Sequence, residues 1–378
     1  MLKQYPHDVL LRPDHDETAR QEFVMDLRKA VGDGMMAGNR VLYDRVVLPT
    51  FIREHNRPPV TRTEIRHAME RAPYHQASLS MHRLTYEMAW ESIMASLDRQ
   101  IGDINDRASA RTKTRGSLRL DPSLPLPRYL SALDNHCMPG SYHADGRPED
   151  LYQGALYDRG DFIISMGTRG PLIDEYGDLL VEYVKRENAD LKPLRILDLG
   201  CAVGHDTLPW CDSYPRAEVH AIDTGGPMLR YAHARAESLG KTVHFSQQNA
   251  EKTDFADDSV DIVASCLLIH ETSRTALRNI FRESRRILKP GGLMIHMDGS
   301  QFAGRDLFRN FMYDYSTHYN SEPFIGTLHE LDLDAELTAA GFAGDEIEVV
   351  DIPRLRDGRG EGTRLSATLG LIKGHKKR

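Results

Sequence analysis

The sequence contains little cysteine and no long apolar run. Its 378 residues include four cysteines, and no two of them form a Cys-x-x-Cys pair. Scattered cysteines are typical of proteins from a reducing compartment. No run reaches the about eighteen apolar residues of a membrane-spanning helix. The first residues, Met1 to Asp8, also lack the apolar segment of a signal peptide, so we expect a cytoplasmic protein without a membrane span.

An excess of basic residues is also missing. The net charge is −8, and the acidic excess lies within residues 151–378. An acidic surface repels polyanions, so the charge argues against nucleic acid as a partner. The four cysteines also give no metal pattern. His136, Cys137 and His143 are close in sequence, but their spacing matches no zinc motif, so no metal is expected.

The N-terminal third predicts helices. Apolar residues recur at helical spacing over 18–36 and again over 80–101. Thr61 and Glu64 have the spacing of a capping box, which predicts a helix start. Five basic residues and three prolines occupy 107–127, which is typical of a linker. We therefore expect an all-helical region over 1–128 that covers a substrate or forms a homodimer.

The rest of the chain alternates between strands and helices. Short apolar runs separated by amphipathic segments predict five strands, at 194–199, 218–223, 242–246, 260–265 and 293–298. Such an alternation is typical of an α/β fold with a doubly wound, mostly parallel sheet. Two more strands, at 346–350 and 365–372, are joined by a polar loop over 354–362 and predict a C-terminal antiparallel hairpin.

The stretch from Leu194 to Asp206 organises this half of the chain. A buried strand ends near Asp198, and glycines follow at 200 and 204. Backbone N–H groups at such a turn can approach a ligand closely. The spacing is not the Gly-x-Gly-x-x-Gly of dinucleotide-binding proteins. An acidic residue at the end of the strand suits a ligand that carries positive charge and no pyrophosphate.

Five motifs in order resemble class I S-adenosylmethionine-dependent methyltransferases, and the ubiquinone and menaquinone biosynthesis enzymes in particular. They are 198–204, 223–229, 249–251, 255–261 and 286–293. The first has Ala202 where the family most often has glycine, and the second has Gly225 in place of serine. A C-terminal hairpin after a parallel sheet is also the arrangement known for this family. The resemblance implies a methyltransferase domain over 129–378.

The resemblance further implies S-adenosylmethionine as cofactor and S-adenosylhomocysteine as product. Asp223 would accept from both ribose hydroxyls, and Asn249 would accept from the adenine amine through its amide oxygen. Met228 would pack on the adenine or in the core. Ala202 would allow close approach if its φ is negative. The expected cofactor residues are Asp198, Gly200, Cys201, Ala202, Gly204, Asp223, Thr224, Met228, Asn249, Ala250, Glu251 and Cys266.

The methyl acceptor is described less well by the sequence. The strand at 260–265 is not followed by the Asn/Asp-Pro-Pro-Tyr of many methyltransferases that act on nitrogens of DNA, RNA and protein, which favours a small molecule. His270 is the first candidate for a general base or substrate orienter, followed by Glu271, with His296 weaker. His270 could instead serve as a hydrogen-bonding residue at a helix start.

Two aromatic-rich segments are candidates for the acceptor pocket. They are 139–162 and an insertion over 303–328, and the residues expected to contact the acceptor are Tyr152, Tyr157, Phe311 and Tyr315. An aromatic insertion at the ligand end of a sheet suits a lid over an apolar acceptor. It could equally pack on the core or on a second subunit.

These features together predict methyl transfer to a small organic acceptor, at oxygen first, with nitrogen or carbon open. One alternative is a methyltransferase acting on RNA or protein that docks through the basic stretch Arg107 to Arg119. Another is a protein that binds the cofactor without catalysis.

Overall fold

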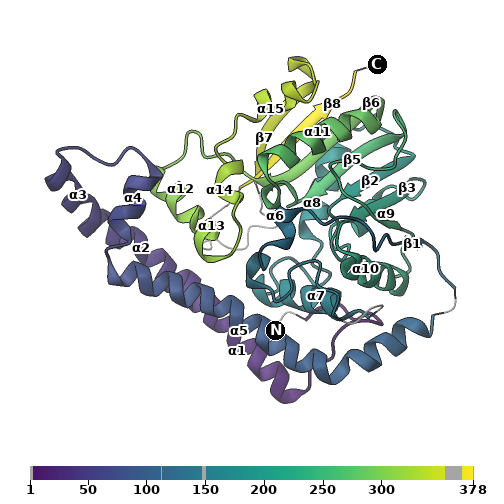
Figure 1. Ribbon diagram of the computed structural model, residues 1–378, viewed down its shortest axis with the longest axis horizontal. Helices are drawn as coiled ribbons and strands as arrows, with labels where there is room; N and C mark the ends of the chain where they lie inside the picture. Colours follow the sequence, from purple (N-terminus) through teal and green to yellow (C-terminus); the bar gives the residue numbers. More distant parts are fainter. Residues whose placement is uncertain (1–2, 112, 147–149, 354–367, 378) are drawn as a thin grey trace.

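A computed structural model describes residues 3–111, 113–146, 150–353 and 368–377. Its central sheet has helices on both faces, and a long helical arm runs beside it and extends beyond it (Figure 1). Among the described residues, no helix is long and apolar enough to cross a membrane. The predicted α/β architecture with a helical N-terminal region is confirmed.

The sheet has eight described strands in the order β1-β4-β3-β2-β5-β6-β8-β7. All neighbouring strands are parallel except β8, which is antiparallel to both β6 and β7. The predicted C-terminal antiparallel pair is therefore confirmed, whereas its predicted loop at 354–362 lies outside the described residues. The strands are β1 Ser117–Arg119, β2 Arg195–Leu199, β3 Glu218–Asp223, β4 His244–Gln247, β5 Val260–Cys266, β6 Leu288–Gly299, β7 Ile347–Pro353 and β8 Thr368–His375.

Both faces of the sheet are buried. Ile196 and Ile262 belong to an apolar cluster with helices α8 Glu175–Glu187, α9 Leu208–Ser213 and α10 Gly226–Ser238. Their sequence neighbours Leu197 and Val263 point to the opposite face. There they pack with α11 Arg274–Ile287, α14 Ile325–Leu328 and α15 Leu333–Ala339. Strands covered on both faces require continuous apolar runs, and this requirement explains why they were recognisable in the sequence.

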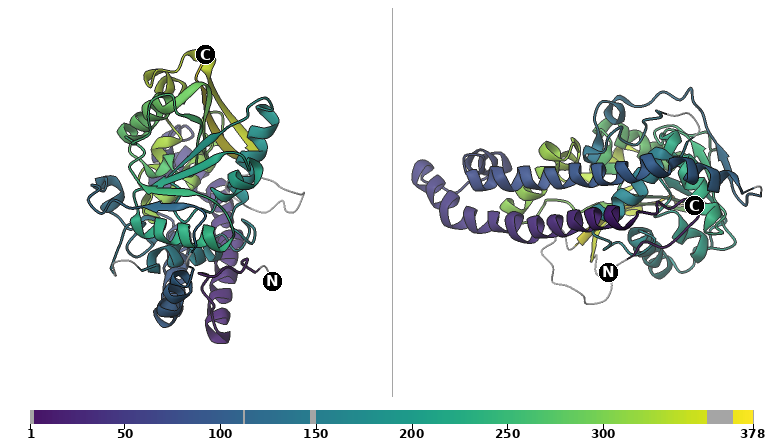
Figure 2. Two further views of the ribbon diagram at one scale, coloured as in Figure 1. Left: turned by 90° about the vertical axis from the view of Figure 1, so that its right-hand side faces the viewer. Right: turned by 90° about the horizontal axis from the view of Figure 1, so that it is seen from below.

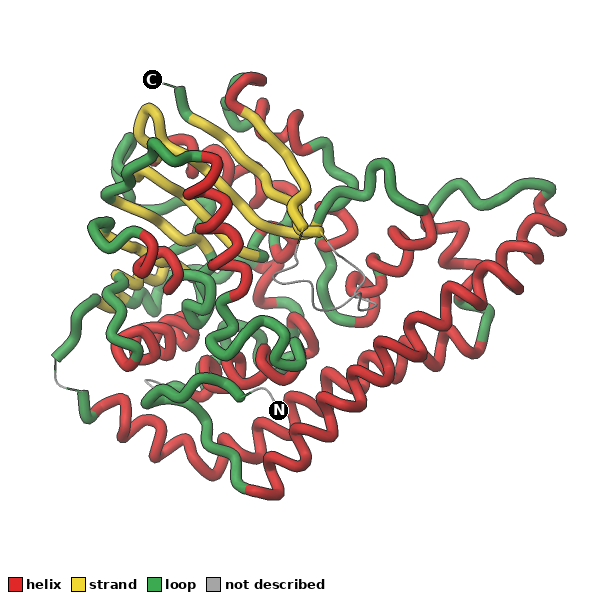
Figure 3. The backbone as a smooth tube through the Cα atoms, turned by 180° about the vertical axis from the view of Figure 1, so that it is seen from behind, coloured by secondary structure: helices red, strands yellow, loops and turns green. Residues whose placement is uncertain are grey.

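The helical arm consists of two long antiparallel segments (Figures 2 and 3). The outgoing segment is α1 His15–Ala30, η1 Val31–Met36, α2 Ala37–Leu42, η2 Tyr43–Val47 and α3 Leu48–His55. After α4 Arg62–Met69, the single helix α5 Pro73–Ser109 returns along it. Buried residues of α1 and α5, such as Val24 and Trp90, share one cluster with residues of α7 Tyr152–Ile164 and α10. The arm is thus packed onto the α/β half of the chain over a continuous core.

The segment expected to be a linker contains an edge strand. Ser117–Arg119 pairs in parallel with His244 to Ser246 of β4. The Glu237 carboxylate accepts hydrogen bonds from the backbone N–H groups of Arg115 and Gly116, both at 2.7 Å. The expectation of a plain linker is therefore wrong at this point. A three-residue edge strand has too little apolar alternation to be recognised from sequence.

The aromatic insertion connects the arm to the sheet. It folds into α12 Leu307–Tyr313 and α13 Tyr315–Tyr319, followed by α14. Phe308 and Phe311 are buried against Tyr43, Ile65 and Met69 of the arm. The remaining short helices are α6 Arg128–Ser131, η3 Asn135–Cys137, η4 Ile269–Glu271 and η5 Gly344–Glu346.

Candidate active site

The glycine loop after β2 is folded against the end of β3. The backbone N–H groups of Gly200 and Cys201 both donate to the carbonyl of Ile222, at 2.8 and 3.1 Å. Gly200 has a φ of +68°, and a Cβ there would lie 2.6 Å from the Leu268 side chain. Glycine is therefore required at this position by both conformation and space.

Ala202 adopts a left-handed conformation. Its φ is +44°, so the expectation of a negative φ at this residue is wrong. A left-handed φ costs a residue with a Cβ roughly 1–2 kcal/mol. Glycine would avoid this cost, so Ala202 is a strained point in the loop.

Asp223 fixes the loop from the end of β3. Its carboxylate accepts from the N–H of Ala202 at 2.9 Å and from the N–H of Gly225 at 2.7 Å. Each carboxylate oxygen keeps a second lone pair that can accept from a ligand hydroxyl. Burial raises the pKa of Asp223. A Cβ at Gly225 would lie 2.4 Å from the Tyr142 carbonyl oxygen, so the packing favours glycine at this position.

Asp198 lies under the loop. It is buried and accepts from the Thr207 hydroxyl at 2.5 Å. Burial, reinforced by the nearby carboxylates of Asp206 and Asp223, raises the pKa of Asp198 to about 7. A positively charged ligand would favour the ionised form of this group, so the site suits a cation.

These residues surround a cavity of about 1100 Å³, counted to its open mouth. We call it the first cavity. Tyr129, Tyr142 and His205 also border it. The expected cofactor residues that line it are Asp198, Gly200, Cys201, Ala202, Asp223, Thr224, Asn249, Ala250 and Cys266.

Three expected cofactor residues do not line the first cavity. Met228 is 0% exposed and packs in the apolar core. Glu251 accepts from the Tyr129 hydroxyl at 2.9 Å and from the Asn279 amide at 2.8 Å. Gly204, with a φ of +77°, donates from its backbone N–H to the Cys201 carbonyl at 2.8 Å. These residues support the cavity from outside, a difference that motif spacing cannot reveal.

Asn249 lines the first cavity, and its side chain also holds the following turn. Its amide oxygen accepts from the backbone N–H of Glu251 at 2.8 Å. The amide NH₂ is then the group with two donors to offer a ligand. The amide oxygen keeps a second lone pair, so Asn249 can both donate to a ring nitrogen and accept from an amine.

A second, larger cavity of about 1970 Å³ lies between the sheet and the helical arm. It is rich in aromatic side chains from three parts of the chain. The aromatic lining residues are Tyr86, Trp90, Tyr157, Tyr176, Tyr313 and Tyr315. The two cavities share five lining residues, namely His136, Tyr157, Arg169, Leu267 and His270. They therefore meet beside the end of β5.

The four residues expected in the acceptor pocket are divided by the structure. Tyr157 borders both cavities, and Tyr315 borders the second. Phe311 and Tyr152 border neither of these two. Phe311 packs against the His75 ring, with 5.5 Å between ring centroids, and Tyr152 packs beside the cluster shared by α5 and α7.

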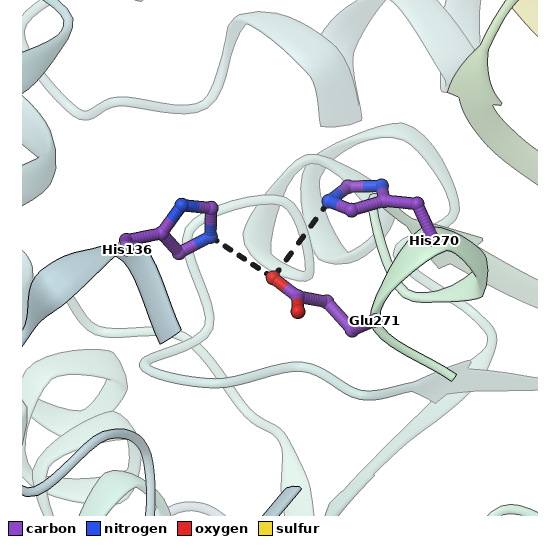
Figure 4. Close-up of side chains that lie close together, drawn as sticks. All are labelled: His136, His270 and Glu271. Atoms are coloured by element: carbon purple, nitrogen blue, oxygen red, sulfur yellow. Dashed lines mark hydrogen bonds and ion pairs between the residues drawn. The ribbon is translucent and has the colours of Figure 1, made fainter. Parts of the chain in front are cut away.

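The predicted base candidates belong to a buried network at this junction (Figure 4). His270 lies 2.7 Å from Asp298 through Nδ1, and its Nε2 lies 3.7 Å from Glu271 Oε1. The same Glu271 oxygen lies 2.9 Å from His136 Nε2. The other Glu271 oxygen accepts from the Asn135 amide at 2.5 Å. Histidine and carboxylate groups thus alternate along the junction.

The charges of this network perturb one another strongly. Burial alone would lower the pKa of His270, but Asp298 and Glu271 raise it to about 9. Burial would raise the pKa of Glu271, but His136 and His270 hold it at about 2. The carboxylates of Glu322 and Glu271 likewise raise the pKa of His136 well above its usual value against the effect of burial.

His296 stands apart from both cavities. It is 0% exposed, and its Nδ1 lies 2.7 Å from the Ser265 hydroxyl. Burial lowers the pKa of His296 to about 4. Conversely, no local pattern indicates that His136 reaches Glu271, because the two residues lie 135 positions apart.

Comparison with known proteins agrees with the geometry of the first cavity. Residues 196–292 match the methyltransferase domain family. A malonyl-[acyl-carrier protein] O-methyltransferase from Methylococcus capsulatus is 34% identical over 103 residues, which cover 26% of this chain and 35% of the relative. A demethylmenaquinone methyltransferase from Thermus thermophilus is 32% identical over 108 residues, which cover 28% of this chain and 47% of the relative. The matched segment thus spans less than half of either relative.

Among solved structures, the chain is similar to a phosphoethanolamine N-methyltransferase 2 from Haemonchus contortus, solved with phosphomonomethylethanolamine and S-adenosylhomocysteine. The TM-score is 0.40 and the identity 16%, with 58% of this chain and 60% of that chain covered.

The residues present fit the cofactor of this family. Asp223 offers lone pairs for hydroxyls, Asn249 offers amide donors, and Asp198 favours a cation, while positive-φ residues leave the loop backbone accessible. The chain therefore carries a methyltransferase domain over residues 196–292.

Proposed function

We propose that the chain transfers a methyl group from S-adenosylmethionine in the first cavity to a small organic acceptor in the second, with oxygen as the preferred acceptor atom. The observation that supports this proposal is that the two cavities meet at five shared residues, among them His270. Methyl transfer is an in-line displacement, so donor and acceptor must be held on either side of one point.

The cofactor, when bound, supplies a methyl group on a sulfonium, which is already an excellent leaving group. The protein therefore has to orient the two partners and exclude water. Asp223 would accept from the ribose hydroxyls, and the Asn249 amide would donate to the adenine. Asp198 would balance positive charge beneath the loop. Each of these side chains lines the first cavity.

The aromatic lining of the second cavity supports an acceptor with an apolar or aromatic body. The network at the junction supports a polar end on that acceptor. His270 and Glu271 would orient the acceptor oxygen. A hydroxyl acceptor would release its proton to solvent, because His270, with its pKa of about 9, is already protonated at neutral pH. A carboxylate acceptor would need no base. The name of the Methylococcus capsulatus relative, an O-methyltransferase, supports oxygen as the acceptor atom.

The helical arm would serve as the cover of the acceptor site. Met36, His82, Tyr86 and Trp90 all line the second cavity from the arm. Phe308 and Phe311 of the insertion bury their rings against the arm, while Tyr313 and Tyr315 line the cavity. We therefore favour a covering role over a homodimer seam for region 1–128.

A radiolabel experiment tests the proposal. The protein is incubated with methyl-labelled S-adenosylmethionine and, separately, with small phenols and carboxylic acids, total RNA and a protein mixture. We expect label in a small acceptor only. Label confined to RNA or protein, or none in any pool, would contradict the proposal. His270→Ala should keep cofactor binding and lose turnover, and full activity in this variant would remove His270 from the mechanism.

A further inference from the structure

The two histidines of the junction are arranged alike. His270 has its Nδ1 2.7 Å from Asp298, and His136 has its Nδ1 2.9 Å from Glu322. In both rings Nε2 faces Glu271, and both approach the same carboxylate oxygen (Figure 4). A carboxylate on Nδ1 fixes the ring orientation, as in most histidines that ligate metals. When an ion displaces the proton from Nε2, this nitrogen becomes an electron-pair donor that faces Glu271.

The three facing atoms have the spacing of a ligand set. His136 Nε2, His270 Nε2 and Glu271 Oε1 all lie within 4.8 Å of one another, and two of the separations are 2.9 and 3.7 Å. An ion bound at roughly 2.0–2.2 Å from nitrogen and oxygen ligands needs them about 3–3.5 Å apart. Small side-chain rotations would bring all three to that spacing.

We propose that His136, His270 and Glu271 bind one divalent transition-metal ion at the junction of the two cavities. Two imidazoles and one carboxylate suit Zn²⁺, Mn²⁺, Fe²⁺, Co²⁺ or Ni²⁺ rather than Ca²⁺ or Mg²⁺. Asn135 holds the second oxygen of Glu271, and so orients the carboxylate. The site has no zinc motif in the sequence, because its ligands come from η3 and η4, which are far apart along the chain.

The position of the site gives the ion a role that rests on the proposed function. His136 and His270 line both cavities, so the ion has coordination positions open towards the acceptor. It would hold an acceptor hydroxyl or carboxylate oxygen. A bound hydroxyl would lose its proton to solvent, its oxygen would bond to the methyl carbon, and the bond from that carbon to sulfur would break. The acceptor class is thus one with an oxygen able to ligate a metal.

Metal binding is tested without any acceptor. Untagged protein is stripped with EDTA, dialysed, and titrated with Zn²⁺ and with Mn²⁺ by calorimetry, with metal content measured by mass spectrometry. We expect one ion per chain. His136→Ala and His270→Ala should abolish this stoichiometric binding. Glu322→Gln and Asp298→Asn should weaken it about 10–100-fold, because each orients a ligand.

His143→Ala is the matched control, since this histidine lies seven positions from His136 and outside the cluster. It should bind the ion like the unmodified chain. X-ray absorption of the zinc-loaded unmodified protein should show two imidazole nitrogens, and this readout does not depend on the folding of any variant. No stoichiometric binding, equal binding by His136→Ala and the unmodified chain, or no imidazole ligation would overturn the proposal.

Titration with S-adenosylhomocysteine on the metal-stripped protein separates the two proposals. Cofactor binding without metal binding would overturn the metal site and leave the proposed function standing. Metal binding without cofactor binding would contradict the proposed function, whereas the proposed metal site would still be supported.

Discussion

Asp158 hydrogen-bonds both to the N-terminal segment and to His205, which follows the glycine loop. Its removal should strongly destabilise the fold. Asp158 is 0% exposed. One carboxylate oxygen lies 2.6 Å from His205 Nε2. The other accepts from the Tyr231 hydroxyl at 2.8 Å and the Gln4 amide at 3.0 Å, and lies 3.3 Å from His7. Gln4 and His7 belong to the N-terminal segment, Tyr231 belongs to α10, and His205 directly follows Gly204.

Asp158→Ala leaves these buried donors without an acceptor. Breaking a buried ion pair costs about 3–5 kcal/mol, and we expect a loss of that size in the free energy of unfolding. Asp158→Asn keeps one acceptor oxygen, so it should cost less, about 1–3 kcal/mol. Asp212→Ala serves as the control variant. It removes an exposed ion pair with Lys241, which should contribute about 0–1 kcal/mol to the free energy of unfolding.

Urea unfolding followed by circular dichroism measures all three variants. The pKa of Asp158 is held well below its usual 3.8 by His205 and His7, against the effect of burial. A depressed carboxyl pKa contributes stability above the unfolded value and loses it as the pH falls. The difference in free energy of unfolding between Asp158→Ala and the unmodified chain should therefore become smaller below about pH 4. A loss under 1 kcal/mol at pH 7 would refute the reasoning.

Three further predictions concern the cavities. Ala202→Gly should raise the free energy of unfolding by about 1 kcal/mol or less, since relief of the positive φ exceeds the added chain entropy; a denaturation curve showing a loss would contradict this. The pKa of Asp198 is about 7, so this carboxyl ionises between pH 6 and 8, and the affinity for S-adenosylmethionine should rise up to about tenfold over that range. Calorimetry measures the affinity, and an affinity that falls with rising pH would refute this prediction. Tyr315→Ala should raise the acceptor KM about 5–30-fold without changing cofactor affinity; an unchanged KM would remove Tyr315 from the pocket.

The parts of the fold that sequence reasoning could predict are those with dense local signals. Strands such as β2 and β5 are buried on both faces and therefore appear as short, mostly apolar runs. The glycine loop and Asp223 follow from one motif and its spacing. The edge strand β1 could not be found, because its pairing depends on β4, more than a hundred residues away.

Most of the residues expected to contact the cofactor line the first cavity, whereas the junction of the two cavities was predicted less completely. Spacing identified His270 and Glu271 but could not show that His136 faces them, since that contact depends on the path of the whole segment between them. Motif resemblance likewise assigns a position without its contacts. Met228 and Glu251 stand at motif positions, yet they pack and hydrogen-bond outside the first cavity.

Calorimetric titration with S-adenosylhomocysteine and with NAD tests the central claim, that the first cavity holds S-adenosylmethionine. We expect one molecule of S-adenosylhomocysteine per chain and no binding of NAD. Asp223→Ala should weaken binding by about 1–3 kcal/mol, or roughly 5–150-fold in Kd, because the ribose hydroxyls lose their acceptor. Binding of NAD without S-adenosylhomocysteine, or an unchanged Kd in Asp223→Ala, would contradict the account.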